Sequence, residues 1–186
     1  MANCFSRFNK MKVLRTKING VLIIQGDRHL DYRGYLREVL IEKKIKKRFK
    51  FQITSVSKKN VLRGLHFQIR KPQGKLISVL KGRIFDTIID LRKNSKTFKK
   101  SFSIKLSAKN CKSVYIPPGF AHGFLTLDKE NIVSYNCTEY RYPKGECSLN
   151  YKDPNLKIKW PVKNPIVSKK DKQAPNLKYY LDKIIK

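Results

Sequence analysis

The stretch 60-NVLRGLHFQIRKPQGKL-76 decides how the chain folds, because it combines short apolar segments with a histidine and flanking cations. Val61–Arg63 and Leu65–Gln68 are typical of β-strand, and the glycine between them indicates a bulge or the close approach of another backbone. Pro72, Gln73 and Gly74 predict a turn. Lys75 begins the next apolar segment, so the stretch predicts strands joined by a turn.

Short strands separated by turn residues continue on both sides of this stretch. They are predicted at Val21–Ile24, Phe51–Ser57, Leu76–Leu80, Arg83–Leu91, Ser101–Leu106, Lys112–Ile116, Phe120–Leu127 and Asn131–Thr138. Ile41, Ile45 and Phe49, spaced by four, predict a short helix between residues 39 and 49, and another is expected within 176–186. This pattern predicts an all-β sandwich or barrel.

The length of 186 residues is within the usual range for one domain, and the sequence contains no internal repeat or linker. We therefore predict a single domain over residues 1–186, with the basic residues 1–17 as a loose arm. No apolar run approaches the roughly 18 residues of a membrane helix, and the first residues lack the apolar segment of a secretory signal. Four cysteines without CxxC spacing favour reduced thiols and a cytoplasmic location.

The charge is strongly positive, with 43 Lys and Arg against 13 Asp and Glu and a formal net charge of +30. Such a balance attracts polyanions, so nucleic acid is one partner to consider. The cations are spread from Lys10 to Lys186, however, and no helix-turn-helix, zinc-finger or RNP pattern is present. We favour a solvated lysine-rich surface that suits phosphate-bearing small ligands, and expect neither a nucleic-acid nor a membrane partner.

Of three histidines, His66 and His122 fall on predicted strands. A catalytic metal usually needs at least three protein ligands, and neither histidine has a carboxylate or second histidine at ligand spacing, so we predict no metal. His66 can instead act as a general base, a role that needs a carboxylate to orient its ring. The candidates are Asp86, Asp90 and Asp171. A core histidine beside solvated cations is the alternative.

Two further side chains fit a proton transfer at His66. Lys75, nine residues later, can stabilise a developing oxyanion. Tyr135 shares one face of its strand with Val133 and Cys137 and can return a proton. The alternative for Tyr135 is a core aromatic side chain whose hydroxyl is satisfied.

Several blocks of the sequence resemble the dTDP-4-dehydrorhamnose 3,5-epimerase family of sugar-nucleotide epimerases. In the family's order they are Asp31-x-Arg33-Gly34, RGLHFQ at 63–68, QGKL at 73–76, DLR at 90–92, IPPGFAHGF at 116–124, Asp153-Pro154, Ile158-x-Trp160-Pro161 and Ser168-x-x-Asp171. RGLHFQ together with PPGFAHGF is a specific combination, unlike a single glycine motif. The resemblance implies a cupin-type jelly-roll barrel with short peripheral helices, a homodimer, and catalysis without metal or cofactor.

The resemblance also implies roles for individual residues. The family's base falls on His66, paired with Asp171, its acid on Tyr135, and the lysine near the substrate's keto oxygen on Lys75. Positions that hold the sugar nucleotide fall on Arg33, Glu38, Arg63, His122, Tyr140, Glu146 and Lys170. The implied reaction inverts C3 and C5 of dTDP-4-dehydro-6-deoxyglucose through an enolate, giving dTDP-4-dehydrorhamnose for surface polysaccharide synthesis. Because the C4 ketone acidifies both protons, acid–base chemistry suffices.

The sequence departs from the family at two places. Phe51 and Ile53 stand where the family usually has a Gln-x-Asn pair, and Tyr151 replaces a frequent tryptophan. These departures leave the nucleotide and the sugar open. The alternatives are a 3-epimerase, an enzyme for another NDP-sugar, or a non-catalytic cupin that binds sugar nucleotides. Glu38 has the alternative of being a solvated carboxylate without a role in binding. Asp86 is expected to be a buried residue outside the catalytic set.

Overall fold

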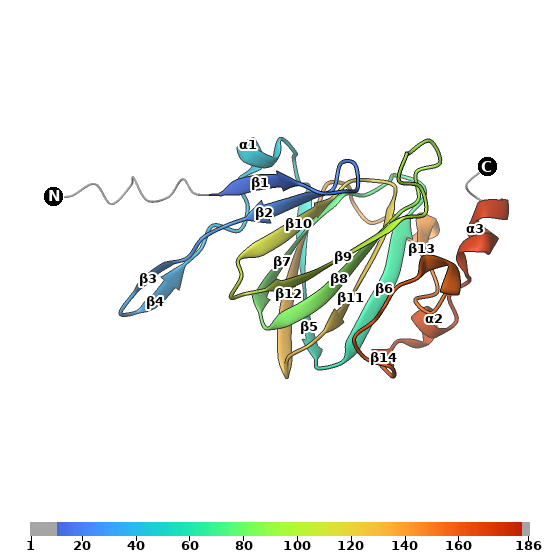
Figure 1. Cartoon of the computed structure of the whole chain (residues 1–186). Helices are drawn as coiled ribbons and strands as arrows, with labels where there is room; N and C mark the ends of the chain where they lie inside the picture. The colour runs from blue at the N-terminus through green and yellow to red at the C-terminus, as the bar shows by residue number, and fades with distance from the viewer. Residues whose placement is uncertain (1–10, 184–186) are drawn as a thin grey trace.

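Two β-sheets face each other in the computed structural model, which describes residues 11–183 (Figure 1). The first sheet contains β1 (Lys12–Arg15), β2 (Leu22–Gln25), β5 (Phe51–Lys58), β7 (Lys75–Lys81), β10 (Lys112–Ile116) and β12 (Glu130–Cys137). The second contains β6 (Val61–Gln68), β8 (Arg83–Asp90), β9 (Ser101–Ser107), β11 (Phe120–Thr126), β13 (Glu146–Ser148) and β14 (Ile166–Val167). The strand orders are β1-β2-β10-β7-β12-β5 and β13-β6-β11-β8-β9, with β14 parallel to β6.

Successive strands from β5 to β8 pass from one sheet to the other, as in a jelly roll, which confirms the predicted fold class. The predicted strand, turn and strand over residues 76–91 are present, but β7 and β8 belong to opposite sheets and do not pair. Gly82 makes this turn with φ of +79°, and a Cβ on it would lie 2.5 Å from the Glu130 carbonyl oxygen. A short turn therefore takes the chain from one sheet to the other. Alternation of apolar residues does not show whether the two strands beside a turn pair or lie in opposite sheets.

The main core lies between the sheets. It contains Ile77 and Val133 from the first sheet and Ile88 and Phe124 from the second, all buried. Gly64 lets β6 and β11 approach closely, because a Cβ there would lie 2.6 Å from the His122 carbonyl oxygen. The close backbone approach expected at this glycine is confirmed.

Short helices cover the outer faces of the sheets (Figure 1). They are α1 (Glu42–Ile45), α2 (Lys169–Lys172) and α3 (Leu177–Lys183), with 3-10 turns η2 (Pro143–Gly145) and η3 (Pro154–Leu156). The helix expected over 39–49 is limited to α1, because Lys46 takes a left-handed conformation (φ 55°) and ends it. Ile41, Ile45 and Phe49 still pack together against the first sheet.

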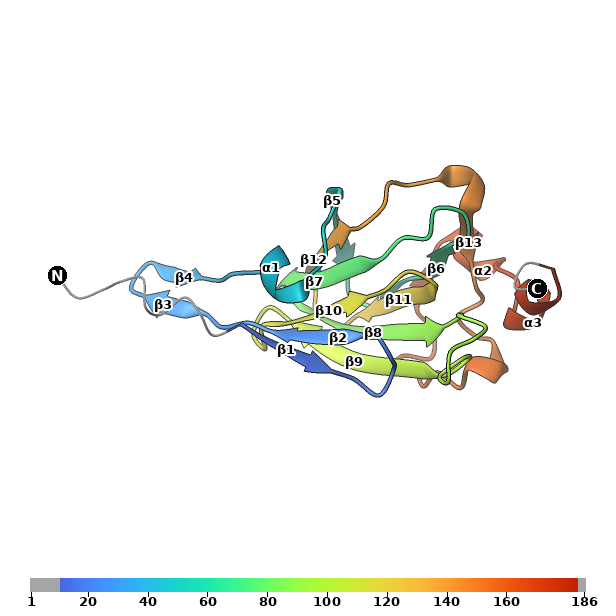
Figure 2. The same cartoon turned by 90° about the horizontal axis from the view of Figure 1, so that it is seen from above.

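The N-terminal prediction needs correction. Lys12–Arg15 is not part of a loose arm: it forms β1, paired antiparallel with β2, whereas residues 1–10 lie outside the described part. The block Asp31-x-Arg33-Gly34 lies at the tip of a hairpin formed by β3 (His29–Asp31) and β4 (Gly34–Leu36). This hairpin extends away from both sheets (Figure 1, Figure 2). No helix within residues 11–183 is long and apolar enough to cross a membrane.

Candidate active site

The His66 ring lies beside the Asp171 carboxylate. Strand β14 pairs in parallel with the start of β6, and Ser168, directly after β14, caps α2 by accepting a hydrogen bond from the Asp171 backbone N–H (3.1 Å). This arrangement brings Asp171 Oδ1 to 2.7 Å from His66 Nε2, while the Gly64 N–H donates to Oδ2 (3.3 Å). Of the three carboxylates considered from the sequence, the structure places Asp171 at His66.

Burial by itself would raise the pKa of Asp171. The hydrogen bond and charge of His66, the Gly64 amide and Ser168 outweigh burial, so this pKa lies below its usual value. Asp171 therefore stays ionised at neutral pH and presents a full negative charge to the His66 ring. A carboxylate in this position orients the imidazole and stabilises its protonated form.

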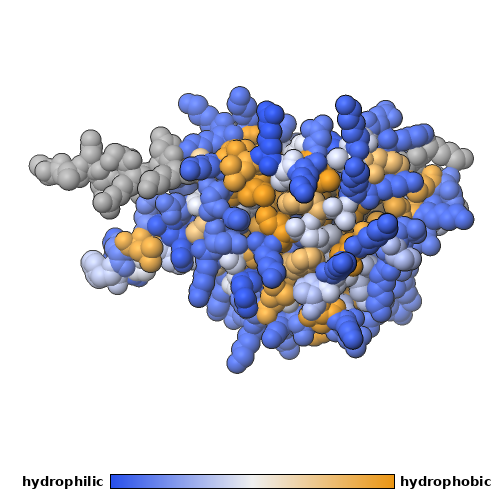
Figure 3. Space-filling model, in the orientation of Figure 1, coloured by the Kyte–Doolittle hydropathy of each residue, from blue (hydrophilic) through white to orange (hydrophobic). Residues whose placement is uncertain are grey.

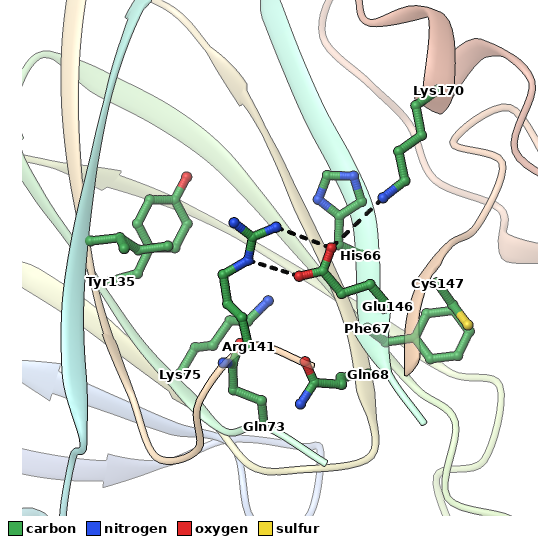
Figure 4. Close-up of a pocket in the computed structure, with 11 residues that line it drawn as sticks. His66, Phe67, Gln68, Gln73, Lys75, Tyr135, Arg141, Glu146, Cys147 and Lys170 are labelled. Carbon is green, nitrogen blue, oxygen red and sulfur yellow. Dashed lines mark hydrogen bonds and ion pairs between the residues drawn. The ribbon is translucent and has the colours of Figure 1, made fainter. Parts of the chain in front are cut away.

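A small cavity of about 110 Å³, here called the inner cavity, opens beside His66 (Figure 4). Its lining residues are Ile53, His66, Phe67, Gln68, Gln73, Lys75, Tyr135, Arg141, Glu146, Cys147 and Lys170. His66 comes from the second sheet and Tyr135 from the first, so the two face each other across the cavity (Figure 4). Lys75 begins β7 and also reaches the cavity.

The environments of Lys75 and Tyr135 both favour their neutral forms. Burial lowers the pKa of the Lys75 ammonium, although nearby Cys137, Glu146 and Asp86 partly oppose this effect. Burial raises the pKa of Tyr135 to about 12, and its hydroxyl lies 3.1 Å from Ser55 Oγ. Tyr135 is therefore a phenol that keeps its proton at neutral pH.

A second cavity of about 420 Å³, the outer cavity, lies on the other side of His66. It is lined by Val61, Leu62, Arg63, His66, Arg141, Glu146, Ile166, Val167, Ser168, Lys170 and Asp171. Arg63 is held by hydrogen bonds from Nε to Ser57 Oγ (3.0 Å) and from Nη2 to the Val56 carbonyl (3.3 Å). Of the substrate-binding residues predicted from the sequence, the structure brings Arg63, Glu146 and Lys170 to these cavities.

Sequence reasoning missed Arg141, which lines both cavities. Its guanidinium forms a fork with Glu146, with Nε 2.8 Å from Oε1 and Nη2 3.2 Å from Oε2. The Glu146 pKa is lowered chiefly by this contact. Gln68 and Gln73 were also missed as cavity residues, although their positions in RGLHFQ and QGKL were a signal. Arg141 gave no signal, because it pairs with a carboxylate five residues away in a turn-rich region.

His122 and Tyr140 line neither cavity. His122 neighbours His66 on the adjoining strand β11, but it is buried and its Nε2 lies 2.7 Å from Asp86 Oδ2. Asp86 is therefore buried as expected, as the partner of the second histidine. Tyr140 stacks on Phe51 with ring centroids 5.8 Å apart.

Arg33 and Glu38 also lie outside both cavities of their own chain. Arg33 is at the tip of the β3–β4 hairpin and pairs with Asp31, with Nη2 2.6 Å from Oδ2. Glu38 is half-buried on the segment that follows β4. The structure thus separates these two predicted substrate-binding residues from the rest.

Within residues 11–183, no three His, Cys, Asp or Glu side chains are grouped so that they could hold a metal ion. The arrangement places a histidine with its carboxylate on one wall, a protonated phenol on the opposite wall and a buried lysine nearby. These are the parts needed to remove a proton next to a carbonyl and to return one to the other face.

Comparison with known proteins agrees with this geometry. The family model described as dTDP-4-dehydrorhamnose 3,5-epimerase matches residues 15–179. The chain is 42% identical over 171 residues to the dTDP-4-dehydrorhamnose 3,5-epimerase of Methanothermobacter thermautotrophicus, covering 88% of this chain and 92% of that protein.

Two solved structures illustrate the range of similar folds. A dTDP-6-deoxy-D-glucose-3,5-epimerase of Legionella pneumophila in complex with dTDP-4-keto-L-rhamnose has a TM-score of 0.86 and 39% identity, over 90% of this chain and 93% of that one. A 3′-monoepimerase of Streptomyces bikiniensis in complex with dTDP-quinovose also has a TM-score of 0.86 at 27% identity, over 91% and 89%. On these grounds, the chain belongs to the dTDP-4-dehydrorhamnose 3,5-epimerase family.

Proposed function

We propose that this protein is an isomerase that inverts C3 and C5 of dTDP-4-dehydro-6-deoxyglucose, giving dTDP-4-dehydrorhamnose for deoxysugar synthesis. The observation that carries this proposal is the pairing of His66, on one sheet, with Asp171 of α2, together with the position of Tyr135 on the opposite sheet. The inversion of a carbon needs a base on one face of the sugar ring and an acid on the opposite face. A binding protein has no use for both.

In this mechanism the C4 ketone makes the C3 and C5 protons acidic, and His66 removes one of them. Asp171 stabilises the imidazolium that forms. Lys75 stabilises the enolate oxygen at C4, a contribution whose loss typically costs about 10²–10³ in rate. Tyr135 then protonates the carbon from the opposite face. No redox step occurs, so the reaction needs neither a cofactor nor a metal.

Deuterium exchange tests the proposal directly. The protein is incubated with dTDP-4-dehydro-6-deoxyglucose in deuterated water, and label is located by NMR, with His66→Ala as the control. Label at both C3 and C5 that depends on His66 supports the 3,5-epimerase. Label at C3 alone assigns the reaction to a 3-epimerase, the activity named for the similar 3′-monoepimerase.

The absence of label would contradict the proposal for this substrate. Ile53 lines the inner cavity where the family usually has an amide, so nucleotide sugars with other bases or sugars are tested in the same way. Absence of exchange with the whole panel would leave a non-catalytic, sugar-nucleotide-binding cupin.

We also propose that the protein acts as a homodimer in which the β3–β4 hairpin of each copy reaches the other copy's site. The hairpin exposes Leu30, Tyr32, Tyr35 and Leu36, and Figure 3 shows hydrophobic residues on it at the left. A two-stranded hairpin without a covered face is only marginally stable in water. A second copy would cover this surface and bring Arg33 to a nucleotide, a contact that is out of reach within one chain.

Subunit complementation tests this arrangement. Arg33→Ala and His66→Ala are purified separately, mixed, and exchanged by dilution and reconcentration. A mixed dimer contains one site with both residues intact if Arg33 acts across the interface, so we expect activity to reappear on mixing. A persistent lack of activity in mixtures shown by native mass spectrometry to contain heterodimers would refute the shared site.

Further parts of the proposal concern the whole chain. We propose that residues 1–186 act as one domain and that the enzyme works in the cytoplasm, without nucleic-acid or membrane partners. The three described cysteines, Cys111, Cys137 and Cys147, are free, which is consistent with a reducing compartment. The predicted contacts of Glu38, His122 and Tyr140 with the nucleotide sugar are kept as part of this proposal.

A further inference from the structure

A wall of charged side chains separates the inner cavity from the outer cavity. The two cavities share four lining residues, His66, Arg141, Glu146 and Lys170. The Arg141–Glu146 ion pair lies within this shared wall, and Figure 4 shows the Arg141 guanidinium between Tyr135 and His66. Because side chains rather than backbone form the pair, rotamer changes alone can open it.

The sugar of a nucleotide ligand needs more room than the inner cavity alone provides. The inner cavity measures about 110 Å³, below the roughly 300 Å³ at which ligand pockets usually begin. Lys75 and Tyr135 lie in the inner cavity, whereas Arg63 lies in the outer one. A ligand whose sugar reaches Tyr135 while its phosphates reach Arg63 must therefore extend through the Arg141–Glu146 pair.

The pair is partly exposed to solvent. The side-chain exposed fractions are 64% for Arg141 and 25% for Glu146. Ion pairs at the surface typically favour their closed form by only about fivefold or less, so a bound anion can compete with this one. A diphosphate offers the guanidinium two acceptor oxygens in the same fork geometry as a carboxylate. Lys170, whose Nζ is 3.9 Å from Glu146 Oε2, remains as a partner for the released carboxylate.

We propose that Arg141 is a specificity-determining residue that exchanges Glu146 for the diphosphate of a nucleoside-diphosphate ligand. Glu146 occupies the phosphate-binding fork when the site is empty and moves toward Lys170 when it is filled. The identity of the nucleoside rests on the proposed function, but the exchange itself requires only a diphosphate.

The change in anion affinity caused by each of two substitutions distinguishes this exchange from a purely structural ion pair. Arg141→Gln and Glu146→Gln break the same pair, so a structural role predicts similar effects on binding. The exchange predicts instead that only Arg141→Gln weakens the binding of dTDP and of inorganic pyrophosphate, measured by calorimetry. Arg141→Gln should weaken both by about tenfold to a hundredfold, because a charged hydrogen-bonding fork is lost. Glu146→Gln should bind pyrophosphate as tightly as wild type or up to about fivefold tighter, because no carboxylate competes.

Arg83 provides a matched control. Its guanidinium also donates two hydrogen bonds to a carboxylate, with Nε at 2.9 Å and Nη2 at 2.7 Å from Asp128 Oδ1, and the side-chain exposed fractions are 60% and 34%. Arg83 lines neither the inner nor the outer cavity. Arg83→Gln should therefore leave the pyrophosphate affinity unchanged while it removes the same positive charge.

Three outcomes overturn the exchange: Arg141→Gln binds pyrophosphate like Arg83→Gln, the Arg141 and Glu146 variants lose affinity equally, or wild-type protein binds neither anion. The epimerase proposal is judged separately by deuterium exchange. If wild-type protein catalyses deuterium exchange and Arg141→Gln keeps its pyrophosphate affinity, the proposed change of partner at Arg141 is refuted and the epimerase proposal stands. If pyrophosphate binding depends on Arg141 but no deuterium enters any substrate, the change of partner at Arg141 is supported and the epimerase proposal is refuted.

Discussion

At the scale of single residues, burial shifts the pKa values of Tyr135 and Lys75 in opposite directions, and both shifts suit the proposed proton transfer. Burial raises the pKa of Tyr135 to about 12, so the phenol is a proton donor throughout the neutral range. Burial lowers the pKa of Lys75, which makes its ammonium a better donor to an enolate oxygen. The ionised Asp171 lies 2.7 Å from His66 Nε2 and orients the imidazole ring. In the proposed reaction, the base and the acid therefore lie on different walls of one cavity.

Tyr135→Phe should separate proton removal from inversion. His66 keeps its carboxylate in this variant, so C–H removal and return on the same face continue, and deuterium still enters the substrate. Inverted product should fall by about 10²–10⁴, because the acid on the opposite face is missing. The measurement is NMR of label and product in the same sample, with Ser55→Ala, which leaves the phenol in place, as the milder comparison. An unchanged yield of inverted product would make Tyr135 a core aromatic residue.

At the scale of secondary-structure elements, hydrogen bonds to Asp90 connect the end of β8 to the segment that leads to β9. Its carboxylate accepts hydrogen bonds from Arg92 Nε (2.9 Å), Ser95 Oγ (2.6 Å) and Thr97 Oγ1 (2.7 Å). Burial alone would raise the pKa of Asp90, but hydrogen bonds from these three side chains outweigh it and lower the pKa to about 2. The DLR block that resembles the family thus has a structural use outside both cavities.

Asp90→Asn should destabilise the protein by about 2 kcal/mol at pH 7, since a pKa lowered from 3.8 to about 2 stabilises the folded, ionised form by that amount. Because the pKa of Asp90 is lower in the folded than in the unfolded state, its carboxylate contributes fully to the free energy of unfolding above the unfolded-state pKa. This contribution is lost as the pH falls through about 2. The difference from wild type should therefore shrink between about pH 4 and pH 2, as measured by urea unfolding. Asp128→Asn, at an exposed ion pair, should have a much smaller effect. A loss independent of pH would show that packing, not charge, makes Asp90 important.

At the scale of the whole molecule, the net charge of +30 is distributed rather than gathered into a site. Figure 3 shows hydrophilic side chains projecting over the whole visible face, with apolar groups between them. In most ion pairs of the described residues the cationic partner is exposed, and acidic residues are too few to neutralise the lysines. The folded state consequently carries substantial self-repulsion.

Salt should stabilise this protein, because it screens the repulsion among lysines over about 8–10 Å at physiological strength. We expect Tm at pH 7 to rise between low salt and about 0.3 M, by about 2–4 °C for each kcal/mol of repulsion removed. Calorimetry in sodium chloride and in choline chloride checks this, because equal rises exclude specific cation binding. A Tm that is constant or falls with salt would show that the surface charges are already balanced locally.

The sequence by itself was enough to predict the strands from β5 to β12 and an all-β sandwich or barrel. The resemblance to the family added the jelly roll, and the catalytic roles of His66, Lys75 and Tyr135 stay a prediction. Alternation of apolar residues reports which face of a strand is buried, and motif spacing carries the resemblance to the family. Only the tertiary structure decided which strands pair, because a short turn such as Gly82 can join one sheet or cross between two. It also set Arg33 apart from the cavities and closed the wall between them with Arg141 and Glu146. Such contacts depend on where segments far apart in the sequence meet in space, and a local sequence pattern carries no information about that.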